Sequence, residues 1–224
     1  MKYEINGGVM PYVLCTLDVN EMLISEAGAM SWMDPGLNME TVGGGFGKVM
    51  GRMFSGETAF LNHYTAMVPN SRIAFASSFP GEIKAITITP DKPVIIQKRA
   101  FLASTPAVEL STHMQQKLGA GLFGGEGFIM NRLSGNGIAF LEIDGSCVEY
   151  VLAPGQKMIL DSGHLVLMDA TCTMDVQRVK GAKNILLGGE GLFNTTVTGP
   201  GRIIIQSMPV ANIAGELARF MPAK

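Results

Sequence analysis

The sequence has few charged residues. They make up 16% of the 224 residues, against 47% hydrophobic residues, which is less charge than an average soluble domain carries. The net charge is −2 and the pI is about 5.9, so the chain lacks the basic surface of a nucleic-acid-binding protein and we expect no nucleic-acid partner. Because little charge is present to cover a monomer, we expect some apolar surface to be buried between subunits.

The sequence also lacks paired cysteines and long apolar runs. Cys15, Cys147 and Cys172 are an odd number without CxxC spacing, which argues against a disulfide framework or a zinc knuckle and favours a reducing compartment. The segment from Met1 to Gly8 has no apolar signal core, and no stretch approaches the ~18 apolar residues of a membrane span. We therefore expect a cytoplasmic protein without a transmembrane segment.

What the sequence has instead is a series of short β-branched segments separated by turn residues. Alternating apolar residues predict strands over 83–88, 94–96, 138–143, 147–152, 158–160, 171–179 and 202–206. The 28 glycines and 11 prolines supply tight turns between them, as at Asp144-Gly145. Short strands at this regular spacing favour an all-β sandwich or barrel over βαβ units.

Two segments break the strand pattern. Residues 111–118 favour a short helix, with Ser111 or Thr112 as its cap. At the carboxyl end, helical spacing predicts an amphipathic helix over 210–221, whose apolar face is formed by Val210, Ile213, Ala214, Leu217 and Phe220. We expect this helix to pack on the β body or on a neighbouring subunit.

The chain contains three diverged copies of one segment. A Gly-Glu pair occurs three times, at Gly56-Glu57, Gly125-Glu126 and Gly189-Glu190, at spacings of 69 (125 − 56) and 64 (189 − 125) residues. Two further glycines recur at the same offset of 64 residues, as Gly135 with Gly137 and Gly199 with Gly201. We predict one compact domain over 1–224, built from three tandem, pseudo-equivalent, jelly-roll-like β units over 1–90, 91–155 and 156–209 and followed by the helix.

The recurring residues have a structural and a functional interpretation. Glycine at a fixed offset indicates that each unit needs positive φ or a close approach at the same point. Glu57, Glu126 and Glu190 would then accept backbone N–H groups and fix a glycine-rich corner. The alternative is a ring of carboxylates that binds a cation or ligand. We favour the structural role, because no base recurs beside these acids.

Other motifs lack the context that their chemistry needs. Residues 119–124 satisfy GxGxxG, but the dinucleotide fingerprint needs a strand before it and a helix after it. Residues 43–49 invite a P-loop interpretation, but Val42 and Val49 occupy the places of the required Gly and Ser or Thr. Non-equivalent positions hold the three histidines, His63, His113 and His164, which argues against a metal site. We predict no catalytic, cofactor-binding or metal-binding residue.

Several segments carry a resemblance to one family. Residues 188–193 (GGEGLF), 198–201 and Gln206-Ser207 resemble the carboxyl-terminal signature of the altered-inheritance-of-mitochondria family, which was long catalogued as a domain of unknown function. Residues 23–30 and 121–127 match its other segments. The resemblance implies a fold similar to the tryptophan-RNA-binding attenuation protein, with its β units fused in tandem. It also implies a prokaryotic cytosolic origin and no established catalytic residues.

These observations predict a protein without enzymatic activity that serves as an oligomeric β scaffold or binding protein. Exposed strand edges favour closed rings, so we predict a homo-oligomer and prefer a cyclic trimer to a dimer. The alternative is a small-molecule-binding protein, or an enzyme with its site between repeats or subunits. RNA binding and a membrane-peripheral role are further alternatives. For residues 48–54, which contain only two cations, we favour a subunit contact over a membrane contact.

Overall fold

The computed structural model describes residues 1–43, 60–116, 128–178, 193–218 and 220. After β1 (Lys2–Asn6), six strands follow: β2 (Tyr12–Leu17), β3 (Met22–Glu26), β4 (Met30–Met33), β5 (Leu37–Gly43), β6 (Phe60–Ala66) and β7 (Ser71–Ala76). The next six are β8 (Gly81–Ile88), β9 (Val94–Gln97), β10 (Phe101–Ser104), β11 (Val108–Gln116), β12 (Phe128–Gly135) and β13 (Gly137–Asp144). The last six are β14 (Cys147–Leu152), β15 (Lys157–Asp161), β16 (Leu165–Asp169), β17 (Thr173–Arg178), β18 (Phe193–Thr198) and β19 (Gly201–Gln206), before helix α3 (Val210–Ala218).

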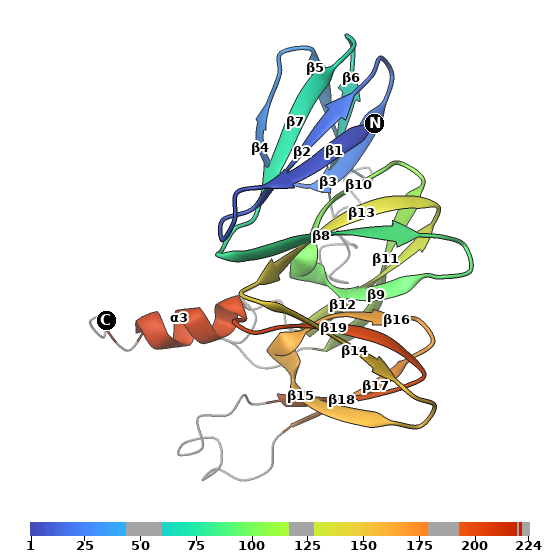
Figure 1. The fold of residues 1–224 in the computed structure, drawn as a ribbon, viewed down its shortest axis with the longest axis vertical. Coiled ribbons are helices and arrows are strands. Elements are labelled where there is room, and N and C mark those ends of the chain that lie inside the picture. The colour runs from blue at the N-terminus through green and yellow to red at the C-terminus, as the bar shows by residue number, and fades with distance from the viewer. Residues whose placement is uncertain (44–59, 117–127, 179–192, 219, 221–224) are drawn as a thin grey trace.

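The strand order repeats with a period of six strands. The antiparallel sheets have the orders β1-β2-β7-β4, β5-β6-β3-β10-β13-β8, β11-β12-β9-β16-β19-β14 and β15-β18-β17. Adding six to each strand number converts one six-stranded sheet into the other. We call β2–β7 unit 1, β8–β13 unit 2 and β14–β19 unit 3. The three units are stacked along the long axis of the molecule, with unit 1 at the top and unit 3 at the bottom of Figure 1.

Neighbouring units share a sheet through one antiparallel strand pair. β3 of unit 1 pairs with β10 of unit 2, and β9 of unit 2 pairs with β16 of unit 3. The hydrophobic clusters follow this sharing, because each of the three contains buried residues from two adjacent units. The core therefore runs through both junctions rather than ending at the edge of each unit.

Local irregularities also recur in the three units. The third strand of each unit has a register shift at the same point, between Met30 and Trp32, Phe101 and Ala103, and Leu165 and Leu167. At the end of that strand or just after it, a side-chain oxygen accepts a backbone N–H from the last strand of the unit. The pairs are Asp34 with Arg72 at 3.0 Å, Thr105 with Ile138 at 3.0 Å, and Asp169 with Arg202 at 2.8 Å. The register shifts are β-bulges, which change the direction of the side chains that follow them.

The prediction of an all-β chain with a C-terminal helix is confirmed. The helix predicted over residues 111–118 is wrong, because β11 (Val108–Gln116) pairs with β12 along its length. A register shift between Thr112 and Met114 interrupts the alternation of side chains between the two faces of the strand. The sequence of this segment therefore lacks the alternating apolar and polar residues typical of a strand. A six-strand period does not choose where one repeat ends, so the boundaries at 90/91 and 155/156 stay predictions.

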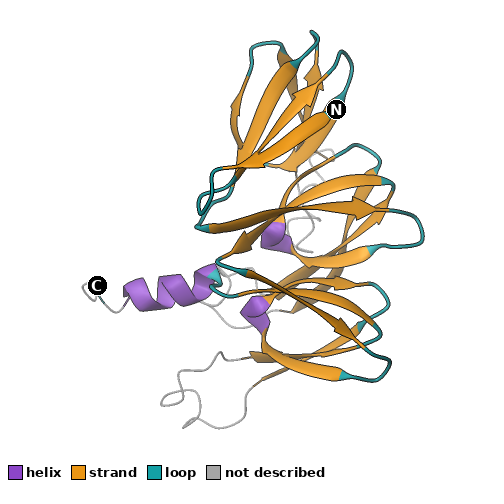
Figure 2. Ribbon diagram, viewed as in Figure 1, coloured by secondary structure: helices purple, strands orange, loops and turns teal. Residues whose placement is uncertain are grey.

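Helix α3 leaves the sheets instead of covering them. It begins two residues after Met208, close to the junction of units 2 and 3, and points away from the strands (Figure 2). Two single-turn 3-10 helices, η1 (Lys98–Ala100) and η3 (Ser162–His164), precede β10 and β16. The C-terminal helix was expected to pack on the β body of its own chain or on a neighbouring subunit. Only its first turn lies against the β body of its own chain.

Candidate functional site

The recurring Gly-Glu pairs, Gly56-Glu57, Gly125-Glu126 and Gly189-Glu190, lie outside the described residues. So do the GxGxxG segment at 119–124 and the loop at 48–54. The proposal that these carboxylates fix equivalent corners therefore stays a prediction.

The other recurring glycines lie at two hairpin turns. Gly135 ends β12, and Gly137 begins β13; Gly201 begins β19, and Gly199 lies just after β18. Gly135 has φ +90° and Gly201 has φ +148°, conformations that L side chains rarely adopt. A Cβ at Gly137 would lie 2.0 Å from Thr105 Oγ1, and one at Gly199 would lie 2.5 Å from Ala153 O. Backbone conformation and close packing thus account for these four glycines.

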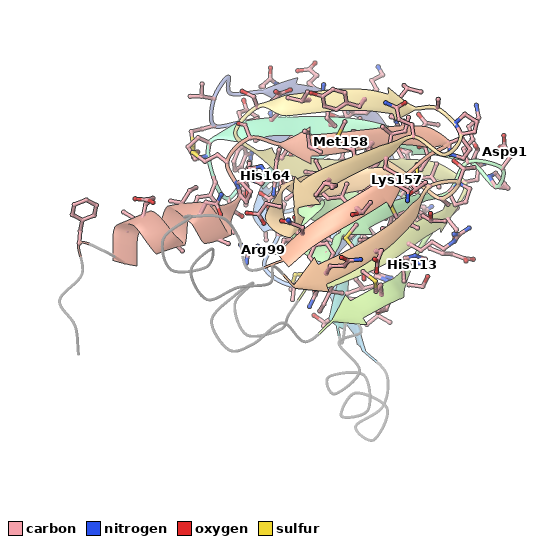
Figure 3. The ribbon with its side chains drawn as sticks, turned by 90° about the horizontal axis from the view of Figure 1, so that it is seen from below. Asp91, Arg99, His113, Lys157, Met158 and His164 are labelled. Atoms are coloured by element: carbon pink, nitrogen blue, oxygen red, sulfur yellow. The ribbon has the colours of Figure 1, made fainter. Side chains whose placement is uncertain are left out.

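The three histidines do not meet. His63 lies on β6, His113 on β11 and His164 in η3, and Figure 3 shows His113 and His164 well apart on the molecule. His164 Nδ1 is 2.7 Å from the backbone oxygen of Gln206. Partial burial and the nearby Arg132 lower the pKa of His113. Within the described residues, no group of three or more His, Cys, Asp or Glu side chains is placed to hold a metal ion.

The cysteines are unsuited to nucleophilic chemistry. All three are free thiols, and Cys15 and Cys172 are buried. Burial raises the pKa of Cys15 to about 12, and burial also raises the pKa values of Cys147 and Cys172. The thiolate is the nucleophilic form of cysteine, so at neutral pH each of these groups is overwhelmingly in its unreactive form.

Two polar side chains, the half-buried Glu142 and the buried Gln206, bridge the junctions between units. At the first junction, Glu142 Oε2 in β13 accepts the backbone N–H of Ser78 at 2.8 Å. At the second, Gln206 Oε1 in β19 accepts the backbone N–H of Asp144 at 2.9 Å, and Gln206 Nε2 donates to Gly163 O at 2.9 Å. Each side chain accepts a backbone N–H group from the segment that leads into its unit from the preceding unit. At the second junction the bonded backbone groups of Asp144 and Gly163 are buried and need such partners, whereas Ser78 at the first junction is exposed.

The first junction holds a carboxyl group where the second holds an amide. Burial raises the pKa of Glu142, against the hydrogen bonds from Ser78 and Ser77 and the charge of Arg99. Burial likewise raises the pKa of Asp144, whose Oδ2 accepts the backbone N–H of Val210 at the start of α3 at 3.1 Å. The sequence analysis did not find these residues. The available signal was the offset of 64 between Glu142 and Gln206, the same offset that links the glycines.

The two ends of the stack expose strand edges that correspond to the paired strands at the junctions. β4 ends the sheet β1-β2-β7-β4, and β15 ends the sheet β15-β18-β17. In Figure 1, β4 lies in the top unit and β15 in the bottom unit. Both edges carry exposed apolar side chains, with Trp32 of β4 47% exposed and Ile159 of β15 68% exposed. Unpaired strand edges with such side chains favour pairing with another chain.

Helix α3 carries a second exposed apolar surface. Leu217 is 61% exposed, and Phe220, just beyond the helix, is 84% exposed. The described part of the chain contains no helix of the length and apolarity needed to cross a bilayer. Helix α3 spans only Val210–Ala218, so its exposed apolar surface is small.

Comparisons with known proteins agree with this fold. The sequence is 29% identical over 234 residues to an uncharacterised protein of Streptococcus pyogenes serotype M6, covering 99% of this chain and 92% of that protein. The crystal structure of a Streptococcus pyogenes protein superposes with a TM-score of 0.81 at 24% identity, over 98% of this chain and 99% of that one. The likeness to the attenuation protein stays a prediction. The mitochondrial biogenesis AIM24 family matches residues 3–208, so the chain belongs to this family, as the sequence resemblance predicted.

Proposed function

We propose that this protein is a β scaffold without enzymatic activity that associates with copies of itself. The observation that carries the proposal is the exposed apolar surface on β4 and β15, at the two ends of the stack, and on α3, which leaves its side. At these places Trp32 is 47%, Ile159 68%, Leu217 61% and Phe220 84% exposed. Contiguous exposed apolar surface on a soluble protein marks an interaction site.

The polar groups support a scaffold rather than an active site. Glu142, Asp144 and Gln206 each accept a backbone N–H across a junction, so their hydrogen-bonding capacity is used within the fold. The buried cysteines have raised pKa values. Because the thiolate is the nucleophilic form of cysteine, these raised pKa values argue against a cysteine nucleophile at neutral pH.

The mass of the protein in solution tests the proposal. Size exclusion with light scattering at micromolar concentration should give a multiple of the chain mass of 23.9 kDa. The mass of one chain across the micromolar range would contradict self-association. A hydrolase and transferase substrate screen with no turnover above a heat-denatured control is expected, and reproducible turnover that co-elutes with the protein would contradict the non-enzymatic part.

A further inference from the structure

We infer that β4 of one copy pairs with β15 of a second copy, head to tail, in the antiparallel register that already joins the units within the chain. This inference rests on the proposed function, since it names the interface through which the copies associate. Its partner is a second copy of this chain, and its chemistry is backbone pairing together with burial of apolar side chains.

The pairing pattern inside the chain identifies the partner. Each internal junction joins the second strand of one unit to the third strand of the next, as β3 to β10 and β9 to β16. β15 is the second strand of unit 3, and β4 is the third strand of unit 1. These two are the strands of their kind that have no such pairing within the described residues. They lie at opposite ends of the stack (Figure 1), so one chain cannot pair them with each other.

The internal junctions also give the register. At the second junction, Leu167 lies opposite Ile96 and Met168 lies opposite Ile95. β15 pairs with β18 as β9 pairs with β12, at an offset of 64, so Ile159 and Leu160 correspond to Ile95 and Ile96. The shared bulges align Trp32 with Leu167 and Met33 with Met168. The inferred interface therefore places Trp32 opposite Leu160 and Met33 opposite Ile159.

Burial of the corresponding residues shows what the second copy would cover. Leu167 and Ile96 are buried in one hydrophobic cluster, and Met168 and Ile95 are buried in another. The second junction thus contributes to the cores on both faces of the shared sheet. At the chain ends, Trp32 and Ile159 are exposed, and Met33 and Leu160 are half-buried. A second copy in the same register would bury Trp32 against Leu160 and Ile159 against Met33.

The charges at the two edges are compatible with this register. Asp34, just after β4, falls opposite Met158, and Lys157 is the neighbouring residue on β15. Figure 3 shows Lys157 and Met158 on the surface at the unit 3 end of the molecule. Asp34 is already paired with Arg72, whose Nε lies 3.0 Å from Asp34 Oδ2, so this register places no like charges opposite each other. A contact between two different edges is heterologous, so it forms a ring when the rotation closes, and the predicted trimer is one closed solution.

Single edge-blocking variants and their mixture test the inference. A lysine in the middle of an edge strand blocks pairing, so Trp32→Lys should block β4 and Ile159→Lys should block β15. Each variant alone should have the mass of one chain, 23.9 kDa. An equimolar mixture should form a complex of two chains, because the intact β15 of the first pairs with the intact β4 of the second. Val9→Lys, at a residue that is 77% exposed outside both edges, is the matched control and should keep the wild-type mass.

Outcomes of this test separate the inference from the proposed function. A wild-type protein of single-chain mass contradicts both. A wild-type oligomer whose mass is unchanged in both lysine variants contradicts the head-to-tail interface and leaves self-association intact. Loss of assembly in one variant only, without recovery in the mixture, indicates a two-fold contact between identical edges and also contradicts the inference.

A covalent cross-link tests the register even where a lysine variant fails to fold. Directly opposed residues of an antiparallel pair lie within disulfide reach. The variant with both Met33→Cys and Ile159→Cys should therefore form oxidant-dependent, reductant-sensitive multimers on a denaturing gel. Met33→Cys alone and Ile159→Cys alone should stay single chains. Multimers from either single variant, or none from the double variant, would overturn the register.

Discussion

The middle of this molecule and its two ends use the same strand geometry with different completeness. At the second internal junction, the paired strands bury apolar side chains on both faces of a shared sheet, and at the first junction the directly paired residues Ser25, Ala103 and Ser104 are also buried. At the ends, β4 is the third strand of its unit, like β10 and β16, and β15 is the second strand of its unit, like β3 and β9. Trp32 of β4 and Ile159 of β15 nevertheless remain exposed. The difference teaches that the units are not independent folding modules. Each unit relies on a neighbour to complete its core, and the end units are the ones left with an incomplete side.

This comparison explains how an apolar, weakly charged chain divides its surface. Half of each six-stranded sheet comes from one unit and half from the next, so the apolar residues at the junctions are removed from water within one chain. A second chain paired at the ends would remove the apolar residues there from water in the same way. The composition alone pointed to subunit contacts, and the strand order shows which edges have the geometry to make them.

The largest loss of stability is expected from a cavity in the middle unit. Phe140 of β13 is fully buried between units 1 and 2, so Phe140→Ala should lower the free energy of unfolding by about 3–5 kcal/mol. Trp32→Ala at the open end should cost about 1 kcal/mol, mostly for its edge-to-face contact with Tyr12 at 5.0 Å. Guanidinium unfolding at a concentration that gives single-chain mass measures both. Equal losses would show that the ends are as well packed as the middle.

The turns of the middle and end units offer a second test. Gly135 in unit 2 has φ +90°, and a Cβ there would lie 2.1 Å from Ala107 O, whereas Gly28 in unit 1 has φ +87° and open space around it. Gly28→Ala therefore isolates the cost of the conformation, about 1 kcal/mol. Gly135→Ala adds the clash and should cost about 3 kcal/mol in the same unfolding experiment. Similar losses would mean that the backbone near Ala107 yields freely.

The sequence predicted strands well where turn residues delimit an alternating segment. β14 (Cys147–Leu152) has the predicted bounds, and β19 begins one residue earlier than predicted. The failure at β11 has a physical cause, because the bulge between Thr112 and Met114 shifts the alternation within the strand. The alternation of apolar and polar residues indicates on which face of the sheet each side chain lies. A bulge moves the following side chains to the opposite face, and the residue types alone do not show this change.

The sequence could not identify the open edges. β9 and β16 pair across a separation of about 70 residues, and local patterns do not indicate which distant strand a strand will choose. Once the pairs are known, the two unfilled places follow from the order of the strands. The junction residues Glu142 and Gln206 were missed for a different reason. A search for repeats that starts from glycines passes over positions where one copy has a carboxyl group and another has an amide.

The difference between the carboxyl group of Glu142 at the first junction and the amide of Gln206 at the second allows a third test, which measures how each group affects stability. Burial raises the pKa of Glu142 above its ordinary value of 4.5, so the folded chain holds a proton there over a pH range in which the unfolded chain has lost it. The stability from this group is therefore full below pH 4.5 and falls as the pH rises through the raised pKa. Glu142→Gln gives the first junction the amide of the second. It should raise the unfolding free energy at pH 7 by about 1 kcal/mol and flatten its fall with pH.

Gln206→Glu is the reciprocal change and should lower stability at pH 7, because it places a second carboxylate in a buried site beside Asp144. Unfolding curves from pH 4 to 8 measure both variants. If Glu142→Gln instead lost stability at pH 7, and this loss disappeared as the pH fell toward 4, the ionised carboxylate of Glu142, close to Arg99, would be the stabilising species.

The smallest effect on the protomer is expected at the outermost element. Leu217 of α3 is 61% exposed, so Leu217→Asp should change the free energy of unfolding by less than about 0.5 kcal/mol, as surface substitutions do. Leu165→Asp, which places the same charge at a fully buried leucine of β16, should prevent folding because the carboxylate has no partner there. Circular dichroism and unfolding of the two variants make the comparison. A loss of several kcal/mol for Leu217→Asp in the single chain would show that α3 folds back onto the sheets in solution, and the ends would then be less open than the strand edges indicate.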